Sequence, residues 1–530
     1  MERYDAIVIG SGIGGLAAAS LLARVGGRRV LVLERQFKLG GLTRSFRRGP
    51  WSWDVGVYYV GEMEDGSMVR RLLDLASGGR LRWNRMPSPI ERFEYPRFAL
   101  AVPDDPLAYR AALEDAFPRE RVGIRAYFGD VARASGWLLR HVGAQAMPAF
   151  AAPLLGRPGR TAALRTTRAV IEARVGDPLL RAVLASQWGN LGLPPSRSAF
   201  ALHAAVVNHY LRGAYYPAGG AGAIAASIVP EIEAAGGACR LNHEVTEVLV
   251  ERGRAVGVRA QARSGGTARE VEFRAPLVIS AAGADTTFLR LLSSRLRPHG
   301  FDGSHTNDGT SVISLYVGLK ESPAALGFGP ENRWLFDGTD HDALYASRGE
   351  LLRGRATAVL LAFPSLKDPA AARAHTAQLV TIADATAFAG WRGRAWRRRG
   401  TEYDALKRAV SDTLLGFVER RYPGFRDQVA YTELSTPMSV EHFTGHRRGI
   451  VYGGAGTPER FRDPAYRVRT HVPGLLLAGT DAGTLGVTGA FMGGALAAAT
   501  ALGPVGFPRI LAASARGARV TDGPSALRDH

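Results

Sequence analysis

The hydrophobic pattern near the start of the chain predicts a buried strand, a turn, a helix and a second buried strand. Residues 6–9 form a short apolar run, residues 16–26 have the small and apolar composition of a helix, and residues 28–34 form a second apolar run that ends at Glu34. Strands that are buried on both faces read as continuous apolar runs rather than as alternating ones. The pattern therefore predicts a parallel β-α-β unit.

The turn in this unit has three glycines in G-x-G-x-x-G spacing, Gly10, Gly12 and Gly15. The first allows a tight turn, the second lets the backbone approach a pyrophosphate, and the third lets the helix pack closely on the strand. The phosphates would lie at the helix N-terminus. Glu34, at the end of the second strand, would accept a hydrogen bond from a ribose hydroxyl. The segment therefore predicts a dinucleotide site.

The loop after Glu34 favours FAD over NAD. Gly40 and Gly41 are followed by Arg44, which suits a loop that wraps a second stretch of pyrophosphate and ribityl chain. The alternative is an ordinary glycine turn with a surface arginine. This loop by itself does not decide between the two.

Residues 478–507 are small and apolar, and Asp481 is their only formal charge. Six glycines before residue 495 disfavour a membrane span, because a span needs one continuous helix. The pattern predicts instead a buried strand over residues 472–479, a loop, and a helix that begins near Gly489. The N-terminus of that helix would face a pyrophosphate or a flavin carbonyl, and Asp481 would hold a ribityl hydroxyl.

Residues 7–23, 32–46 and 474–498 contain the glycine turn, the loop after Glu34 and the C-terminal strand, loop and helix. These segments resemble the FAD-binding parts of the phytoene desaturase, carotenoid isomerase and retinol saturase superfamily of FAD-dependent enzymes. The segments that look most like the retinol saturase and carotenoid isomerase branch are residues 53–61, 198–225, 360–370 and 436–453. The resemblance extends from residue 4 to about residue 505 and is more specific for the flavin fold than for the substrate.

The resemblance implies an α/β fold: a discontinuous Rossmann-type FAD-binding domain, with a parallel sheet and a β-hairpin, plus a mixed α+β substrate domain. Residues 238–262 alternate in strand fashion around the turn at 252–254, which predicts the hairpin, and residues 275–283 predict a further buried strand. The expected FAD-binding domain comprises residues 1–75, 205–290 and 437–508. The expected substrate domain comprises residues 76–204 and 291–436, and residues 509–530 are expected to be a disordered tail.

The resemblance also implies a set of FAD-binding residues. In the family the backbone near Val245 holds the adenine, and Gly283 lies near the nucleotide. The full predicted set is Gly10, Gly12, Ile13, Gly14, Gly15, Glu34, Arg35, Gly41, Leu42, Thr43, Val245, Gly283, Gly479, Asp481, Gly489, Ala490 and Met492.

The catalytic residues are harder to predict, because a flavin needs mainly orientation and exclusion of water from the protein. The candidates from the branch motifs are Asp54, Tyr58, Tyr59, Asn208, His209, Tyr215 and Tyr216. We predict Tyr58, His209 and Tyr216 as catalytic, with Tyr58 or His209 handling the second proton; core packing is the alternative role. The branch often has a histidine where this chain has Tyr58. His442 and Tyr452 are placed near the isoalloxazine. The twelve histidines show no metal-binding spacing, and no metal is predicted.

The net charge of +19, almost all of it from arginine, suggests a surface that attracts anions, with a coding bias toward arginine as the alternative. No nucleic-acid-binding signature is present, so acidic lipid headgroups are favoured. Residues 135–170 mix arginines with Trp137, Met147, Phe150, Leu154 and Leu155, and residues 391–400 mix two tryptophans with five arginines. Both suit a membrane-facing surface, and a packed helical hairpin or a solvated face is the alternative.

The single cysteine, Cys239, excludes a disulfide within the chain. The first residues lack the features of a signal peptide, so we expect a cytoplasmic protein bound peripherally to the inner face of the cell membrane. The predicted function is an FAD-dependent desaturase, saturase or isomerase acting on carbon–carbon bonds of a long apolar polyene, such as a carotenoid or retinoid, with an external electron donor or acceptor. Fatty acyl chains of phospholipids are the alternative substrate. An amine oxidase and a non-catalytic flavin- or lipid-binding protein are further alternatives.

Overall fold

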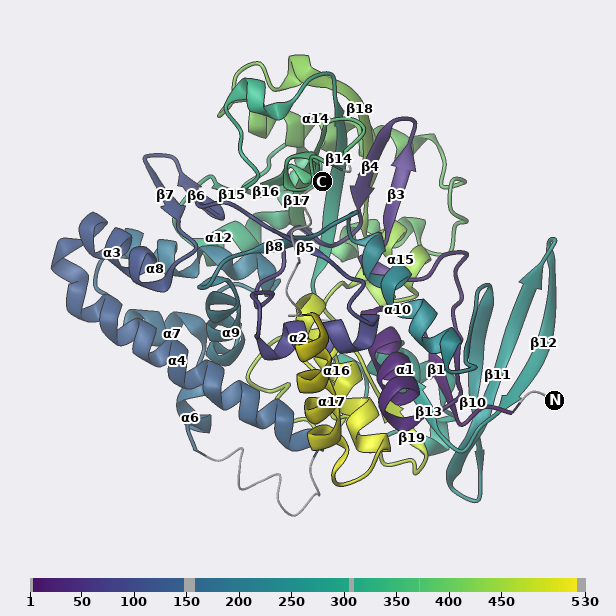
Figure 1. The fold of residues 1–530 in the computed structure, drawn as a ribbon. Coiled ribbons are helices and arrows are strands. Elements are labelled where there is room, and N and C mark those ends of the chain that lie inside the picture. The colour runs from purple at the N-terminus through teal and green to yellow at the C-terminus, as the bar shows by residue number, and fades with distance from the viewer. Residues whose placement is uncertain (1–2, 147–157, 305–308, 371, 522–530) are drawn as a thin grey trace, which may run out of the picture.

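A five-stranded parallel sheet organises one end of the molecule (Figure 1). The computed structural model describes residues 3–146, 158–304, 309–370 and 372–521. In spatial order the strands of this sheet are β19 (Leu475–Leu477), β13 (Val278–Ser280), β1 (Ala6–Ile9), β2 (Val30–Leu33) and β9 (Ala238–Arg240). Every neighbouring pair is parallel. The predicted β-α-β unit and the predicted strands near residues 275–283 and 472–479 are thus confirmed.

Four helices lie against this sheet or against one another: α1 (Ile13–Gly26), α2 (Met68–Ser77), α10 (Gly222–Ala234) and α16 (Gly486–Ala501). Helices α1 and α16 lie side by side (Figure 1). They approach so closely that a Cβ atom on Gly494 would overlap the carbonyl oxygen of Gly14. Helix α16 begins at Gly486, three residues before the predicted start at Gly489. Gly486 takes a positive φ of 77° at the junction of loop and helix, which glycine adopts without steric cost.

A three-stranded antiparallel sheet extends from the parallel sheet, at the right of Figure 1. Its strands are β10 (His243–Glu251), β11 (Arg254–Ser264) and β12 (Thr267–Arg274). The predicted hairpin is confirmed, with its turn at Arg252 and Gly253, both at positive φ. Strand β12 is an addition to the prediction. Most of its side chains are exposed, so its sequence lacks the apolar pattern that marks a buried strand.

A mixed seven-stranded sheet forms the second layer, at the top of Figure 1. In spatial order its strands are β18 (Val429–Ser435), β14 (Ser311–Leu319), β17 (Thr376–Ala383), β16 (Ala358–Ala362), β15 (Asn332–Phe336), β6 (Glu91–Tyr95) and β7 (Phe98–Val102). The pair β15–β6 is parallel and the others are antiparallel. One face packs with α14 (Thr401–Glu419) into a separate hydrophobic core. The predicted α/β fold with a second, mixed region is therefore confirmed.

Helices α3 (Pro106–Ala116), α4 (Arg121–Gly143), α7 (Thr167–Glu172), α8 (Pro178–Ala185) and α9 (Phe200–Tyr210) form a layer beside the two sheets (Figure 1). Within it α4 packs along α9. Trp137 of α4 is fully buried, stacked on His141 and in edge contact with Phe461. Its predicted contact with a membrane is therefore wrong. The other apolar residues named for that surface, Met147, Phe150, Leu154 and Leu155, lie outside the described residues.

The remaining elements used below are β3 (Ser45–Arg48), β4 (Trp51–Asp54), β5 (Trp83–Arg85), β8 (Tyr215–Pro217), α6 (Arg160–Ala163), α12 (His341–Ala346), α13 (Pro364–Lys367), α15 (Pro437–Thr444) and α17 (Gly506–Thr521). Strands β3 and β4 form a hairpin, and β5 pairs with β8. The predicted domain boundaries stay a prediction.

The expectation of a disordered tail after residue 508 is wrong for residues 509–521, which belong to helix α17. Phe507, Ile510 and Leu511 lie at helical spacing, Ile510 is fully buried, and α17 packs on α2 and α16. Burial of these three apolar residues stabilises the helix despite the polar residues around them.

Among the described residues, no single helix has the length and apolar composition to cross a membrane. Helix α16 and residues 506–516 meet those criteria only together, as a pair bent by 118°.

Candidate active site

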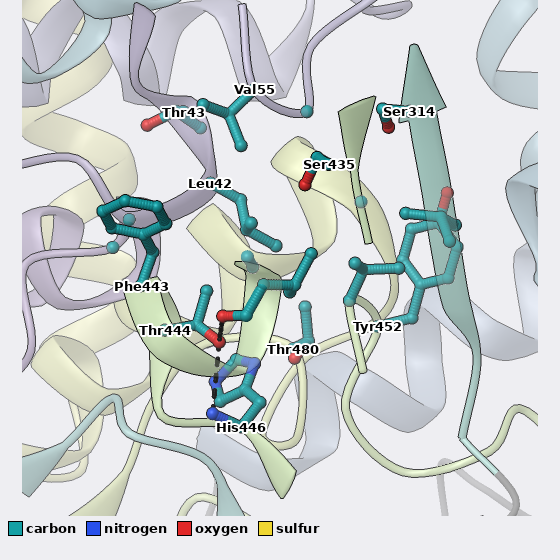
Figure 2. A pocket seen from close by; sticks show the side chains of 18 of the residues that line it. Leu42, Thr43, Val55, Ser314, Ser435, Phe443, Thr444, His446, Tyr452 and Thr480 are labelled. Atoms are coloured by element: carbon teal, nitrogen blue, oxygen red, sulfur yellow. Dashed lines mark hydrogen bonds between the residues drawn. The ribbon is translucent and has the colours of Figure 1, made fainter. Parts of the chain in front are cut away.

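One large cavity lies between the parallel sheet and the seven-stranded sheet, and its lining divides into two parts. Figure 2 shows part of it, with Leu42, Thr43 and Val55 across from Ser314 and Tyr452. We call one part the cofactor half, lined by residues 9–14, 33–35, 41–44, 243–245 and 281–282, and by Gly479, Thr480, Gly486, Val487 and Ala490. We call the other part the substrate half, lined by Tyr58, Trp188, Asn190, Val312, Ser314, Tyr316, Trp334, Phe336, Leu344, Leu351, Ala358, Leu360, Val380 and Ile382.

The glycine turn after β1 is shaped for a phosphate group. A Cβ atom on Gly12 would have no protein atom within 4 Å, because this position faces the cavity. Gly12 also precedes α1 without a side-chain cap, so the free N–H groups of the first turn are open to a ligand. In contrast, a Cβ atom on Gly15 would overlap the carbonyl oxygen of Gly10. The predicted roles of Gly12 and Gly15 agree with this geometry.

Glu34 and Arg44 organise the loop beside the turn. Glu34 is buried at the end of β2, and one of its carboxylate oxygens accepts hydrogen bonds from the Ser11 backbone N–H at 3.0 Å and from the Ser11 hydroxyl at 2.6 Å. Arg44 is also buried, and its Nε donates to the carbonyl of Gly41 at 2.8 Å. Burial lowers the pKa of the Arg44 guanidinium. The alternative of a surface arginine is therefore wrong.

The C-terminal segment closes the cofactor half from the other side, through Gly479, Thr480 and the first turns of α16. Gly283 and Asp481 line a smaller pocket that shares Thr480 and His446 with the large cavity. The Asp481 carboxylate accepts backbone N–H groups of Ala284 at 2.7 Å and Gly454 at 2.9 Å. Asp481 thus ties three loops together, and its predicted contact with the ribityl chain stays a prediction.

Three other predicted FAD-binding residues, Gly15, Gly489 and Met492, do not line the cavity. A Cβ atom on Gly489 would overlap the backbone of Thr484, so this glycine is required by the close approach of loop and helix. Met492 is half-buried and packs against the main hydrophobic core. The other predicted residues, Gly10, Gly12, Ile13, Gly14, Glu34, Arg35, Gly41, Leu42, Thr43, Val245, Gly479 and Ala490, all line the large cavity.

The substrate half is one face of the seven-stranded sheet. Mainly alternate residues of four neighbouring strands line it: Val312, Ser314 and Tyr316 of β14, Val380 and Ile382 of β17, Ala358 and Leu360 of β16, and Trp334 and Phe336 of β15. The residues between them, such as Leu315, Leu335 and Leu361, are buried on the opposite face. Sequence reasoning missed this wall. Its signal was the continuous apolar character of residues 311–319 and 358–362, which is typical of strands covered on both faces.

Of the three predicted catalytic residues, only Tyr58 lines the cavity. Burial raises the pKa of its hydroxyl, while a hydrogen bond with Ser314 opposes that shift. Tyr452 lines the same region (Figure 2), and burial raises the pKa of its hydroxyl to about 12. Both hydroxyls therefore stay protonated near neutral pH.

His209 and Tyr216 support the loop that carries Tyr58 from outside the cavity. His209 Nε2 accepts the backbone N–H of Gly61 at 2.8 Å, and its Nδ1 lies 2.9 Å from the Glu62 carboxylate. The Tyr216 hydroxyl donates to Asp54. Catalytic contact by either residue stays a prediction, and the geometry gives each a structural partner instead.

A buried lysine lies directly behind Tyr58. Lys367 Nζ donates to the Tyr58 carbonyl at 2.6 Å and to the Asn332 side chain. Burial lowers the pKa of Lys367 to about 7, and the carboxylates of Asp54 and Glu91 oppose that shift. This polar cluster fixes the backbone of Tyr58 against the sheet.

The remaining candidates have structural surroundings. Tyr59 donates its hydroxyl to the buried Glu91 and stacks on Tyr210 at 4.2 Å. Tyr215 is buried in the bridge to Val60, and Asn208 is exposed on α9. His442 stacks on Trp396 with ring centroids 5.4 Å apart and does not line the cavity. Within the described ranges, no three His, Cys, Asp or Glu side chains lie close enough to hold a metal ion.

Comparison with known proteins agrees with this geometry. The model of the family described as flavin containing amine oxidoreductase matches residues 13–502. The chain is 30% identical to all-trans-retinol 13,14-reductase of Danio rerio, over 93% of this chain and 85% of that protein. It is 30% identical to the Homo sapiens protein of the same name, over 94% and 86%. It is 25% identical to the chloroplastic prolycopene isomerase of Arabidopsis thaliana, over 86% and 75%.

Solved structures share the fold at lower sequence identity. Putrescine oxidase bound to putrescine superimposes with a TM-score of 0.59 at 17% identity, over 94% of this chain and 99% of that one. Cyclohexylamine oxidase from Brevibacterium oxydans gives a TM-score of 0.57 at 16% identity, over 98% and 100%. At this identity the likeness shows the fold alone.

The family match, together with the glycine turn shaped for a phosphate, shows that FAD is the cofactor of this chain and that the protein is an FAD-dependent oxidoreductase. The residues that would hold FAD are those of the cofactor half, from the turn at Gly12 to the first turns of α16. The chain belongs to the flavin containing amine oxidoreductase family, in the branch of the retinol saturases and carotenoid isomerases.

Proposed function

We propose that this enzyme acts on carbon–carbon bonds of a long apolar polyene of the retinoid or carotenoid kind. The observation that carries the proposal is the substrate half, where the cofactor half opens directly onto a sheet face rich in aromatic and aliphatic side chains. Such a surface binds apolar chains through burial of area rather than through polar contacts. The names of the retinol reductase and prolycopene isomerase relatives support the same substrate class.

Bound FAD would supply two-electron hydride chemistry. The chain itself would hold the polyene against the sheet, exclude water, and present the Tyr58 hydroxyl in the cavity. In saturation, one double bond takes up a hydride and a proton, and an external two-electron donor restores the electrons. The raised pKa keeps the Tyr58 hydroxyl protonated but makes it a weak acid. It would therefore give its proton only to the strongly basic carbon left by hydride addition, with solvent replacing the proton afterwards.

The test uses flavin-loaded protein, reduced with dithionite under anaerobic conditions and mixed with all-trans-retinol or with prolycopene. Saturation adds the mass of two hydrogens, and isomerisation changes chromatographic retention at constant mass. Tyr58→Phe should keep its flavin and lose turnover about a hundredfold. Tyr215→Phe, a buried tyrosine outside the cavity, is the matched control and should stay near wild type. Fully reduced enzyme that leaves both polyenes unchanged would contradict the proposal.

The sequence-based alternatives gain no support from the relatives reported above. None of those relatives is named for acyl lipids. The likeness to the amine oxidases shows the fold alone. Retinoids and carotenoids therefore come first among the substrates to test.

We also propose peripheral binding to acidic membranes, which would bring an apolar substrate to the enzyme. In residues 391–400, Arg397 and Arg398 are exposed while Trp396 packs inward on Phe443, a residue of the cavity wall. A basic surface beside the cavity would attract anionic headgroups. The protein should co-sediment with vesicles that contain phosphatidylglycerol and not with pure phosphatidylcholine vesicles. An Arg397→Glu/Arg398→Glu variant should co-sediment less with the phosphatidylglycerol vesicles. Equal binding to both vesicle types would contradict it.

A further inference from the structure

A stripe of leucine and arginine borders the substrate half. Leu344, Arg348, Leu351 and Arg355 all line the cavity. They are spaced by four, three and four residues along α12, the 3₁₀ segment η8 (Ser347–Arg353) and the turn that follows. Residues 344–353 follow helical turns, and Gly354 at a φ of 89° turns the chain before Arg355, so that all four side chains reach the cavity. The stripe therefore presents two leucines and two arginines to the same cavity.

The stripe lies where the apolar sheet face ends. Strand β15 ends at Phe336, whose partner on β16 is Ala358, and β17 ends one residue after Ile382. Helix α12 follows β15 closely in the chain, and Arg355 comes three residues before β16. An apolar chain lying on the sheet would thus meet the arginines at the end of the strands.

The two guanidiniums are only weakly paired within the chain. Among the described residues, their one ion pair is Arg355 with Asp337, at 3.9 Å, and Asp337 also lies 3.7 Å from Arg421. Arg348 Nη1 donates to the Tyr345 carbonyl at 3.0 Å, and its guanidinium carbon lies 4.3 Å from the Tyr345 ring centroid.

Asp384 interacts electrostatically with Arg348. One of its carboxylate oxygens already accepts hydrogen bonds from the backbone N–H and the hydroxyl of Thr386. Several N–H donors of both arginines therefore remain for an incoming anion.

We propose that Arg348 and Arg355 bind the anionic end of the substrate, so that the preferred substrate is a long apolar polyene ending in a carboxylate or a phosphate. The inference rests on the proposed function and makes its substrate class narrower. A guanidinium forms charge-assisted, often bidentate hydrogen bonds with either group. A neutral alcohol end can accept a single hydrogen bond but forms no ion pair and no bidentate contact, and a hydrocarbon end accepts no hydrogen bond. The arginines would also set which double bond lies next to the cofactor half, because they anchor one end of the chain.

The test compares three probes on the flavin-loaded protein: all-trans-retinoic acid, retinyl phosphate and all-trans-retinol. Dissociation constants are read from the change in flavin absorbance, so that no turnover is needed. The wild type should bind at least one anionic probe about tenfold more tightly than retinol, as expected for part-exposed charge pairs. The two anionic probes distinguish a carboxylate from a phosphate. Added salt should weaken the anionic probes only.

The double variant Arg348→Gln/Arg355→Gln should lose the preference and keep its flavin and its affinity for retinol. Arg353→Gln is the matched control, because Arg353 lies in the same segment but outside the cavity lining, is 77% exposed and pairs with Glu350 at 2.6 Å. Equal binding of all three probes by the wild type, or an equal loss in the control, would overturn only the charge recognition. Failure of all three probes to bind would overturn the retinoid part of the proposed function as well.

Discussion

The two halves of the cavity are lined by different kinds of atoms. The cofactor half consists largely of backbone: glycine turns, strand ends and the first turns of α1 and α16. The substrate half consists of side chains, which alternate along four strands of one sheet face. In the first half a side chain added at a glycine meets either closely packed main-chain atoms, as at Gly14, or the space for the cofactor, as at Gly12. In the second half a substitution changes only the volume and polarity of a wall.

This difference explains how related folds can act on different molecules. Putrescine oxidase and cyclohexylamine oxidase share the fold of this chain, whereas its more similar relatives are named for retinol and prolycopene. A cofactor site defined by backbone geometry is retained as a unit, while a wall of side chains can be exchanged residue by residue. The comparison predicts that substitutions in the two halves fail in different ways.

The largest effect is expected from Gly14→Val. A Cβ atom there would lie 2.5 Å from the Gly479 Cα and 2.8 Å from the Ala490 carbonyl oxygen, so α1 and α16 would have to separate. We expect a loss of more than about 3 kcal/mol in the free energy of unfolding. Denaturant unfolding followed by circular dichroism measures it. Wild-type stability in this variant would mean that the two helices are not held at contact distance.

Gly12→Val should keep the fold and lose the cofactor. Its Cβ atom would meet no protein atom within 4 Å, yet it would occupy the space where the pyrophosphate approaches the helix. We expect FAD affinity to fall by at least about a hundredfold, or about 2.7 kcal/mol, with the unfolding of the apoprotein nearly unchanged. Flavin absorbance after gel filtration reads the first quantity and thermal unfolding the second. A variant that retains full flavin content would argue against the phosphate turn.

A substitution in the substrate half should leave both fold and flavin intact. Leu360→Trp adds bulk to the centre of the sheet face that lines the cavity, and we expect turnover of a polyene to fall about tenfold or more. Its neighbour provides the control, since Leu361 is buried on the opposite face. Leu361→Ala should cost about 2–5 kcal/mol of stability without a change of substrate preference. Steady-state kinetics and flavin content distinguish the two results.

Acid should destabilise the helical layer through one buried histidine. His203 of α9 is buried beside Tyr127, and burial lowers its pKa to about 3. Because the pKa in the folded state is below the unfolded value of about 6.5, stability is present above that pH and is lost as the pH falls toward 3. At pH 5 this histidine alone should cost about 2 kcal/mol. In His203→Gln the unfolding free energy should fall less steeply as the pH decreases below 6.5. An unchanged pH dependence would mean that other groups cause it.

Sequence reasoning identified the cofactor half well, because its requirements are local. Gly12 and Gly15 are needed by a turn and a contact that involve residues close in the chain, and Glu34 follows directly from the strand that ends there. The same reasoning was less successful for catalysis. Tyr58, His209 and Tyr216 occur in equally suggestive motifs, and only the structure shows that Tyr58 alone of the three lines the cavity.

The resemblance to a flavoenzyme family supplied the choice of FAD and the discontinuous fold, and the sequence by itself determined the β-α-β unit and the dinucleotide turn. These depend on backbone conformation and close approach, which leave glycines and apolar runs at fixed spacing. Only the tertiary structure decided the substrate wall, the stripe of Arg348 and Arg355, and the buried places of Trp137 and Arg44. The substrate wall arises where strands distant in the chain, such as β14 and β17, pair in one register. Apolar strands are compatible with many registers, so their sequences alone do not specify which residues meet.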